Sequence, residues 1–287
     1  MGGPGEGDAV RPLSGSNYYV VWSEIVKNIK ILLAYPVVIV FWSTFPILWF
    51  LPFVFQGKAL VGGLRSASFA EFAGTPEFIP FIVIGAVLNS YVLTSLYGMG
   101  ESLRREAYRG TLDYMLAAPC NKAFILIGKA LSESLSSTIF AMAQLAACLL
   151  FFGIGITLGA VVPVLFITIL LIAGLYGIAL MLAALSLYYK QAHDLAHSLE
   201  YVFYVFCPVR YPVRSLPMWA QIVGKLLPLT YALIAVRSVV LMGQDVAAVY
   251  RQMLHLLIMD LFLIFLGFQM FNWMERKTKK SGVISHF

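Results

Sequence analysis

The stretch Ser134–Tyr189, "SLSSTIFAMAQLAACLLFFGIGITLGAVVPVLFITILLIAGLYGIALMLAALSLYY", contains 56 consecutive residues without a formal charge. A helix that crosses the hydrocarbon core of a bilayer needs about 20 apolar residues, so this stretch is long enough for two. Glycines and a proline gather in its middle, at 153–163, and these residues favour a turn. We therefore predict membrane spans at 131–152 and 160–188, joined by that turn.

The composition of the whole chain also indicates a membrane protein. Of the 287 residues, 60% are hydrophobic and 12% are charged, whereas a soluble domain is about 45–50% apolar and about 25% charged. The net charge of +6 is typical of a membrane protein that keeps Lys and Arg on cytoplasmic loops, and nucleic acid is not an expected partner. Cys120, Cys148 and Cys207 lack the spacing of a metal site.

Other apolar runs predict four more spans. Charge-free runs hold spans at 36–56 and 78–100. A fifth span begins near Leu195, and residues 252–274 form a sixth. Between them, the apolar segment 210–251 contains prolines that break a regular helix. The predicted fold class is therefore an all-α membrane protein with six transmembrane helices.

Both ends of the chain are predicted to face the cytoplasm. The N-terminal segment, the loops at 101–130 and 188–196, and the C-terminal tail together hold 13 Lys and Arg residues, against 7 on the opposite side. Positive charge remains preferentially on cytoplasmic loops. We expect a multi-pass protein of a prokaryotic inner (cell) membrane.

The regions outside the spans differ in character. Residues 16–34 repeat apolar side chains at three- and four-residue spacing, which predicts an amphipathic helix in the membrane interface. A longer first span is the alternative interpretation. The predicted domain organisation is a disordered tail at 1–15, the interfacial helix at 16–34, the six-span domain at 35–274 and a cytoplasmic tail at 275–287.

The loop at 101–125 carries a short amphipathic pattern between two apolar segments. Four apolar residues fall on one face of a helix: Tyr108, Leu112, Met115 and Leu116. Pro119 should end this helix. A short helix outside the bilayer either docks its apolar face into a groove on another protein or is a solvated loop helix, and the pattern alone leaves both interpretations open.

The same loop resembles the signature of the ABC-2 type transporter permeases, a family that includes drug, lipid and polysaccharide exporters. Its matching residues follow the pattern E-x-x-R-G-T-L-x-x-M-L-x-x-P: Glu106, Arg109, Gly110, Thr111, Leu112, Met115, Leu116 and Pro119. A second block, "SLPMWAQIVGKLLPLTYALIAVR" (215–237), resembles the family's segment after the fifth span. Its matching residues are Pro217, Trp219, Pro228, Leu229, Thr230, Ala232 and Arg237.

The resemblance implies a role for each block. The first block would be a coupling helix that contacts a separate ATP-binding subunit, which makes its eight residues candidate ATPase-coupling residues. The second would form re-entrant helices on the outer side, over 210–245. The candidate residues of an outer gate there are Pro217, Trp219, Pro228, Thr230 and Arg237.

The resemblance also implies partners and a pathway. Two permease chains, alike or different, would enclose the pathway between their second and fifth spans, with two ATP-binding subunits below. The candidate pathway residues on these spans are Asn89, Tyr91, Thr94, Tyr97, Tyr201 and Tyr204. Membrane lipids would surround the assembly.

Two acidic residues within predicted spans, Glu200 and Asp260, are further pathway candidates. Placing an ionised carboxylate at the bilayer centre costs at least about 2.5–3.5 kcal/mol. Such residues therefore line a pathway or pair with a polar group, for example Arg210 or Arg251. For Glu200, a position at the membrane interface is the alternative.

The chain is not expected to be an enzyme. A P-loop requires G-x-x-x-x-G-K-[ST], and none of the Gly-Lys pairs at 57–58, 128–129 and 224–225 is followed by Ser or Thr. We therefore expect no cofactor in this chain, and ATP with Mg²⁺ on the partner ATPase subunit. The spacing of His193 and His197 could suit a metal, but with four histidines in all we predict no metal site and no catalytic residues.

The predicted function is that of the membrane-spanning subunit of an ATP-driven exporter of an amphipathic, drug-like or lipid-like substrate. An exporter of polysaccharide or glycolipid is the alternative within transport, since aromatic residues stack on sugar rings. A membrane-embedded lipid-modifying enzyme is a more remote alternative, and it predicts a convergent polar catalytic cluster that the sequence does not reveal.

Overall fold

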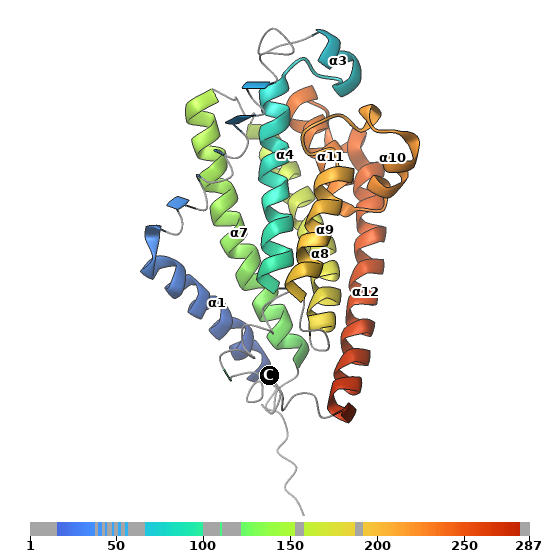
Figure 1. Cartoon of the computed structure of the whole chain (residues 1–287). Helices are drawn as coiled ribbons and strands as arrows, with labels where there is room; N and C mark the ends of the chain where they lie inside the picture. The colour runs from blue at the N-terminus through green and yellow to red at the C-terminus, as the bar shows by residue number, and fades with distance from the viewer. Residues whose placement is uncertain are drawn as a thin grey trace, which may run out of the picture.

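The computed structural model is all-helical in the ranges that it describes (Figure 1). The described residues are 16–37, 40, 41, 44, 48, 51, 52, 55, 56, 67–99, 110, 122–152, 158–186 and 192–281. Within them lie α1 (Ser16–Ala34), α3 (Ala67–Ala73), α4 (Phe78–Leu93), the π-helix η1 (Thr94–Met99), α7 (Lys122–Phe152), α8 (Leu158–Ser186), α9 (Ala192–Phe206), the 3₁₀ helix η2 (Val213–Ser215), α10 (Met218–Lys225), α11 (Pro228–Met242), the 3₁₀ helix η3 (Val246–Val249) and α12 (Tyr250–Ser281).

Three described helical segments are long and apolar enough to cross a membrane: Phe78–Gly98, Gly159–Leu185 and Val246–Met274. They coincide with the second, fourth and sixth predicted spans. The number rises to four if α10 and α11, which meet at 93°, form one broken span. α7 and α9 are helices at the positions of the third and fifth predicted spans, and most of 36–56 lies outside the described residues. The count of six stays a prediction.

The turn predicted at 153–163 is shorter than expected at its C-terminal side. α8 already begins at Leu158, so Pro163 lies inside the helix. A proline near the start of a membrane helix is tolerated because neighbouring helices and local adjustment satisfy the freed carbonyl.

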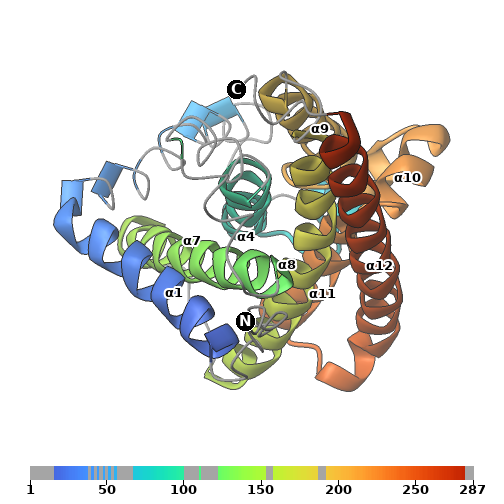
Figure 2. The ribbon, with the colours of Figure 1, turned by 90° about the horizontal axis from the view of Figure 1, so that it is seen from below.

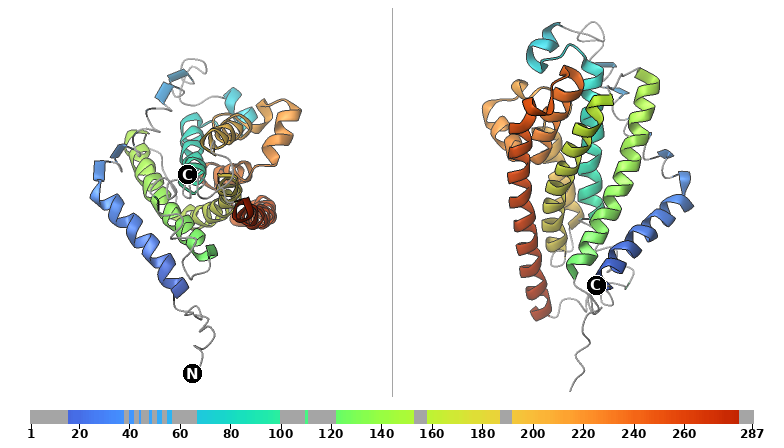
Figure 3. Two further views of the ribbon diagram at one scale, coloured as in Figure 1. Left: turned by 60° about the horizontal axis from the view of Figure 1, so that its bottom comes forward. Right: turned by 180° about the vertical axis from the view of Figure 1, so that it is seen from behind.

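The long helices run side by side and define two ends of the molecule (Figures 1 and 3). At one end, called here the α10 end, lie α3, α10 and the start of α4. At the other, the α1 end, lie η1, the start of α9 and the last turns of α12. The segments that are far apart in sequence, η1 and α9, are therefore brought together at the α1 end.

α8 occupies the middle of the bundle and packs against both α11 and α12 (Figure 2). Glycines make its contact with α12 close: a Cβ on Gly177 would lie 2.6 Å from the carbonyl carbon of Leu263, and one on Gly267 would lie 2.6 Å from the carbonyl oxygen of Gly177. Small residues of this kind allow membrane helices to approach closely and gain van der Waals contact.

α1 lies obliquely along the first half of α7 (Figures 1 and 2). A Cβ on Gly128 of α7 would lie 3.1 Å from the Cα of Val21, and Ser132 donates a hydrogen bond of 3.4 Å to the carbonyl oxygen of Glu24. The outer side of α1 leaves Tyr18, Tyr19 and Trp22 exposed. This aromatic face fits an interfacial position, which stays a prediction.

Candidate functional site

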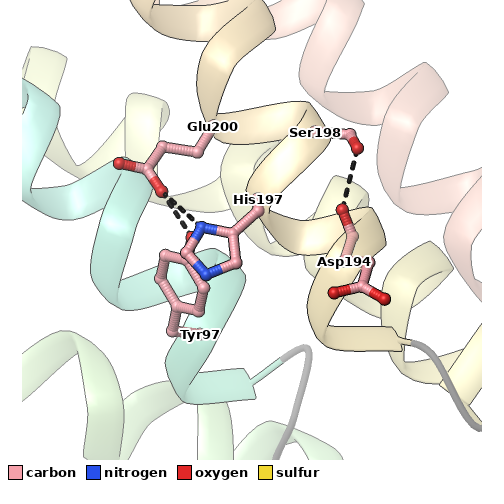
Figure 4. Close-up of polar contacts among 5 residues, drawn as sticks. All are labelled: Tyr97, Asp194, His197, Ser198 and Glu200. Carbon is pink, nitrogen blue, oxygen red and sulfur yellow. Dashed lines mark hydrogen bonds and ion pairs between the residues drawn. The ribbon is translucent and has the colours of Figure 1, made fainter.

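A polar cluster joins η1 to α9 at the α1 end (Figure 4). The Tyr97 hydroxyl donates a hydrogen bond to the Glu200 carboxylate and lies 2.6 Å from Nδ1 of His197. The same His197 nitrogen is 3.4 Å from Oε2 of Glu200. We call these three residues the Tyr97 cluster. It connects the end of one candidate span to the start of another helix through side chains alone.

The π-helix η1 places Tyr97 for this contact. A π-turn holds one more residue than an α-turn and is frequent at functional sites. On its α7 side, η1 carries Gly98, where a Cβ would lie 2.9 Å from the Glu133 carboxylate. The absence of a side chain at 98 therefore lets Glu133 approach the turn closely. The turn is held between a carboxylate of α7 and the cluster on α9.

α9 presents its polar and aromatic residues on one face. His197, Glu200, Tyr201 and Tyr204 follow the spacing i, i+3, i+4 and i+7, which places them on one side of a helix. Tyr201 is 67% exposed. Tyr204 is half-buried, and the Arg210 guanidinium lies over its ring at 4.1 Å from the centroid. This face therefore already holds one cation against an aromatic ring.

Three other pathway candidates lie within α4 and η1. Asn89 and Tyr91 are buried in the bundle. Thr94 donates a hydrogen bond of 3.0 Å to the carbonyl oxygen of Ser90, one turn earlier. The structure thus groups Tyr97 with Glu200, and places Asn89, Tyr91 and Thr94 in packed or helix-internal positions.

Asp260 lies deep in the bundle, between α8, α11 and α12. Its side chain is 2% exposed, and neither carboxylate oxygen has a hydrogen-bond partner among the described residues. A Cβ on Gly174 would overlap its Oδ1 and would lie 3.2 Å from the Cβ of Pro228, the first residue of α11. Of the suggested partners, Arg251 donates instead to the Tyr250 hydroxyl.

A second polar cluster lies at the α10 end, centred on Arg237 of α11. Its Nη2 donates hydrogen bonds to the carbonyl oxygens of Phe81 (2.9 Å) and Val209 (2.8 Å), and its Nη1 donates to that of Pro208. The guanidinium also lies 3.4 Å from the centroid of the Phe81 ring. We call this set the Arg237 cluster.

The Arg237 cluster ties three elements together. Pro208 and Val209 follow directly after α9, so the cation lies near the negative end of that helix, where it is stabilising. Phe81 is in the first turn of α4. The side chain is 4% exposed, and burying a cation is costly unless it is hydrogen-bonded. Backbone carbonyls accept from Nη1 and Nη2, whereas Nε has no hydrogen-bond partner among the described residues.

The other predicted gate residues lie on α10 and α11 or directly before them. Thr230 donates a hydrogen bond of 2.7 Å to the carbonyl oxygen of Gly224, and so bridges α10 and α11. Trp219 contacts Phe206 edge to face at 5.8 Å between ring centroids. Pro217 caps the start of α10, and Pro228 occupies the first turn of α11. The prolines therefore stand where both short helices begin.

A family model described as ABC-2 type transporter matches residues 19–241 of the chain. The chain belongs to the ABC-2 type transporter family. Its membership and the hydropathy of its helices make it a multi-pass membrane protein. A search of curated proteins found no match. ABC-2 permeases are typically non-catalytic transport subunits that pair with ATP-binding subunits.

The candidate coupling residues of this ABC-2 transporter lie outside the described residues, except Gly110. Gly110 is exposed and has a φ of 68°, in the left-handed region that glycine adopts at little cost. The family signature places a glycine at this position, and the backbone geometry gives the reason. The roles predicted for the other seven residues stay predictions.

Sequence reasoning missed the contacts that organise this ABC-2 transporter. It considered His197 only for metal binding, whereas His197 contacts Tyr97 and Glu200. Within the described ranges, no group of three or more His, Cys, Asp or Glu side chains is placed to hold a metal ion. The spacing 197, 200, 201 and 204 was the available signal for the polar face of α9.

Proposed function

We propose that this chain is the membrane-spanning subunit of an ATP-driven exporter, which moves an amphipathic, drug-like or lipid-like substrate out of the cytoplasm or inner leaflet. The family match over 19–241 carries the proposal. A half-exposed polar cluster between η1 and α9 supports a substrate entrance at the α1 end.

The α1 end is the cytoplasmic side in this proposal. The segments that contain or adjoin it carry most of the Lys and Arg residues, as expected of cytoplasmic loops. The α10 end then faces outward, and the bent α10–α11 pair forms the re-entrant segment beside an outer gate. Six spans per chain, two chains and two ATP-binding subunits complete the proposed assembly.

Chain connectivity suggests how the two proteins communicate. η1 ends at Met99 and α7 begins at Lys122, so the predicted loop at 101–125 follows η1 closely and its last four residues already belong to α7. If nucleotide-driven closure of the ATP-binding subunits moves this loop, η1 moves with it. The contact of Tyr97 with Glu200 is the first described link between η1 and α9 that such a movement reaches.

The experiment is purification of the full-length chain from its own source cells, followed by identification of bound proteins that carry a P-loop. An ABC ATP-binding subunit should copurify with the wild type. The double substitution Leu112→Asp and Met115→Asp, which charges the predicted docking face, should release it. Asp113→Asn is the matched control and should retain it, because the helical spacing predicts this residue on the other face.

Two results would count against the proposal in different ways. Absence of an ATP-binding subunit from the wild-type preparation would overturn the proposed function. Undiminished binding by the double variant would leave the exporter function intact but overturn the docking role of the loop.

A further inference from the structure

We infer that the Tyr97 cluster and the neighbouring Tyr201 bind the positively charged group of a lipophilic cation, which makes cationic amphiphiles the substrate class. The inference rests on the proposed function, because it names what the proposed entrance recognises. It is argued from the charge of Glu200, the aromatic face of α9 and the internal cation on that face.

The described contacts of the Glu200 carboxylate include no Lys or Arg side chain. Its contacts among the described residues are the Tyr97 hydroxyl and the His197 imidazole. A hydroxyl has no charge, and an imidazole is cationic only when protonated. With 31% of its side chain exposed, the carboxylate is partly removed from water. An incoming cation would add a Coulomb attraction to the carboxylate that a neutral hydroxyl or a neutral imidazole does not supply.

Tyr201 adds an aromatic surface beside that carboxylate. It is 67% exposed and lies one turn from His197 on the same face of α9. Cations are attracted to the face of an aromatic ring by its quadrupole. The apolar part of such a molecule would pack against the ring, so the site suits an amphiphilic cation.

Tyr204, the next aromatic residue on this face, already makes a cation–π contact within the protein. The Arg210 guanidinium lies 4.1 Å from the centroid of the Tyr204 ring. Tyr201 presents the same kind of ring one helical position beyond Glu200, and a carboxylate accompanies it there. The face therefore has one aromatic ring in contact with a cation of the protein and a second ring open beside an acid.

Binding at this site would also reach the contact between the helices. A cation on Glu200 competes with the Tyr97 hydroxyl for the same carboxylate, and so weakens the link between η1 and α9. A ligand shifts a conformational equilibrium by its difference in affinity for the two states. Cation binding should therefore favour separation of η1 from α9, and η1 leads along the chain into the proposed coupling loop.

The test compares two probes of nearly the same size and shape and opposite charge. The full-length chain is reconstituted in lipid nanodiscs, and equilibrium binding of tetraphenylphosphonium and tetraphenylborate is measured after subtraction of empty nanodiscs. The wild type should bind the phosphonium. Glu200→Gln should weaken that binding about tenfold, since the Coulomb attraction between the carboxylate and the cation is lost.

Further variants separate recognition from folding. Glu200→Asp keeps the charge and should recover part of the lost affinity. Tyr201→Leu should weaken phosphonium binding about threefold, in proportion to an exposed cation–π contact, while Tyr201→Phe should not. Asp245→Asn is the matched control, because it removes an exposed carboxylate that precedes η3 and lies outside both η1 and α9.

Equal phosphonium binding by the wild type and a folded Glu200→Gln protein would overturn the inference, and so would preferential binding of tetraphenylborate. If every Glu200 variant fails to fold, unchanged binding by Tyr201→Leu overturns it instead. None of these binding results would affect the proposed function, which is tested by copurification of the ATP-binding subunit. Loss of that subunit from the wild type would instead overturn the proposed function.

Discussion

The Arg237 cluster and the Tyr97 cluster join helices at opposite ends of the molecule, and they do so differently. Arg237 is 4% exposed and donates to backbone carbonyls of α4 and of the residues after α9. Tyr97, His197 and Glu200 contact one another through side chains, and the His197 and Glu200 side chains are 47% and 31% exposed.

The difference indicates that the helices stay packed together at the α10 end and can separate at the α1 end. A buried cation without its carbonyl acceptors would pay a large desolvation cost, so the helices at the α10 end should stay together. At the α1 end, water can replace each side-chain contact, so opening costs little. The contact between the α4–η1 segment and α9 is therefore hard to break at the α10 end and easy to replace by water at the α1 end.

The largest effect is expected from Arg237→Met. The substitution keeps an unbranched apolar side chain but leaves three carbonyl groups of Phe81, Pro208 and Val209 without their donor. Each unsatisfied buried group costs about 1–3 kcal/mol, so we expect a loss of about 3 kcal/mol or more. Thermal unfolding in detergent or nanodiscs should show a markedly lower midpoint. Arg237→Lys keeps the charge, so its unfolding midpoint should fall between those of the wild type and Arg237→Met.

A smaller but clear effect is expected from Gly85→Ala. The new Cβ would overlap the carbonyl oxygen of Val209 and lie 2.8 Å from Nη2 of Arg237. Overpacking of this kind costs about 1–3 kcal/mol. Gly159→Ala in α8 is the matched control, since nothing lies within 4 Å of its added Cβ. Similar unfolding midpoints for the two variants would show that the α10 end is not tightly packed around Arg237.

The smallest effect on stability is expected from Tyr97→Phe. It removes the hydroxyl that contacts Glu200 and His197 but keeps the ring, so the loss should be about 1 kcal/mol or less. ATP-driven substrate transport by the reconstituted complex should nevertheless change, because η1 and α9 lose their described polar link. A drop in the unfolding midpoint as large as that of Arg237→Met would contradict the proposed difference between the two ends.

Hydropathy predicted three long apolar helices of the structure. The spans at 78–100, 160–188 and 252–274 were predicted because the bilayer excludes charge, and they coincide with three candidate spans of the structure. The prolines of 210–251 were predicted to break a regular helix, and two of them, Pro217 and Pro228, stand where α10 and α11 begin. The burial of Asp260 also followed from its place in the middle of a span.

The partners of the site residues could not be predicted. Hydropathy does not say which helices pack together, so the approach of Tyr97 to His197, 100 positions apart, carried no signal. The partners of Arg237 are carbonyl oxygens, and every residue has one. The π-turn at Thr94–Met99 depends on neighbours such as Glu133 against Gly98, which local propensity does not register.

The most direct test of the account is amide hydrogen exchange, followed by mass spectrometry, on the complex with its ATP-binding subunit. Exchange would be compared without nucleotide and with ATP trapped by vanadate. Local opening exposes amides in proportion to its free energy. The account predicts increased exchange in peptides covering 94–99 and 192–200, with little change in those covering 207–215 and 228–237. Nucleotide-dependent exchange confined to the Arg237 cluster, with none at the Tyr97 cluster, would contradict it.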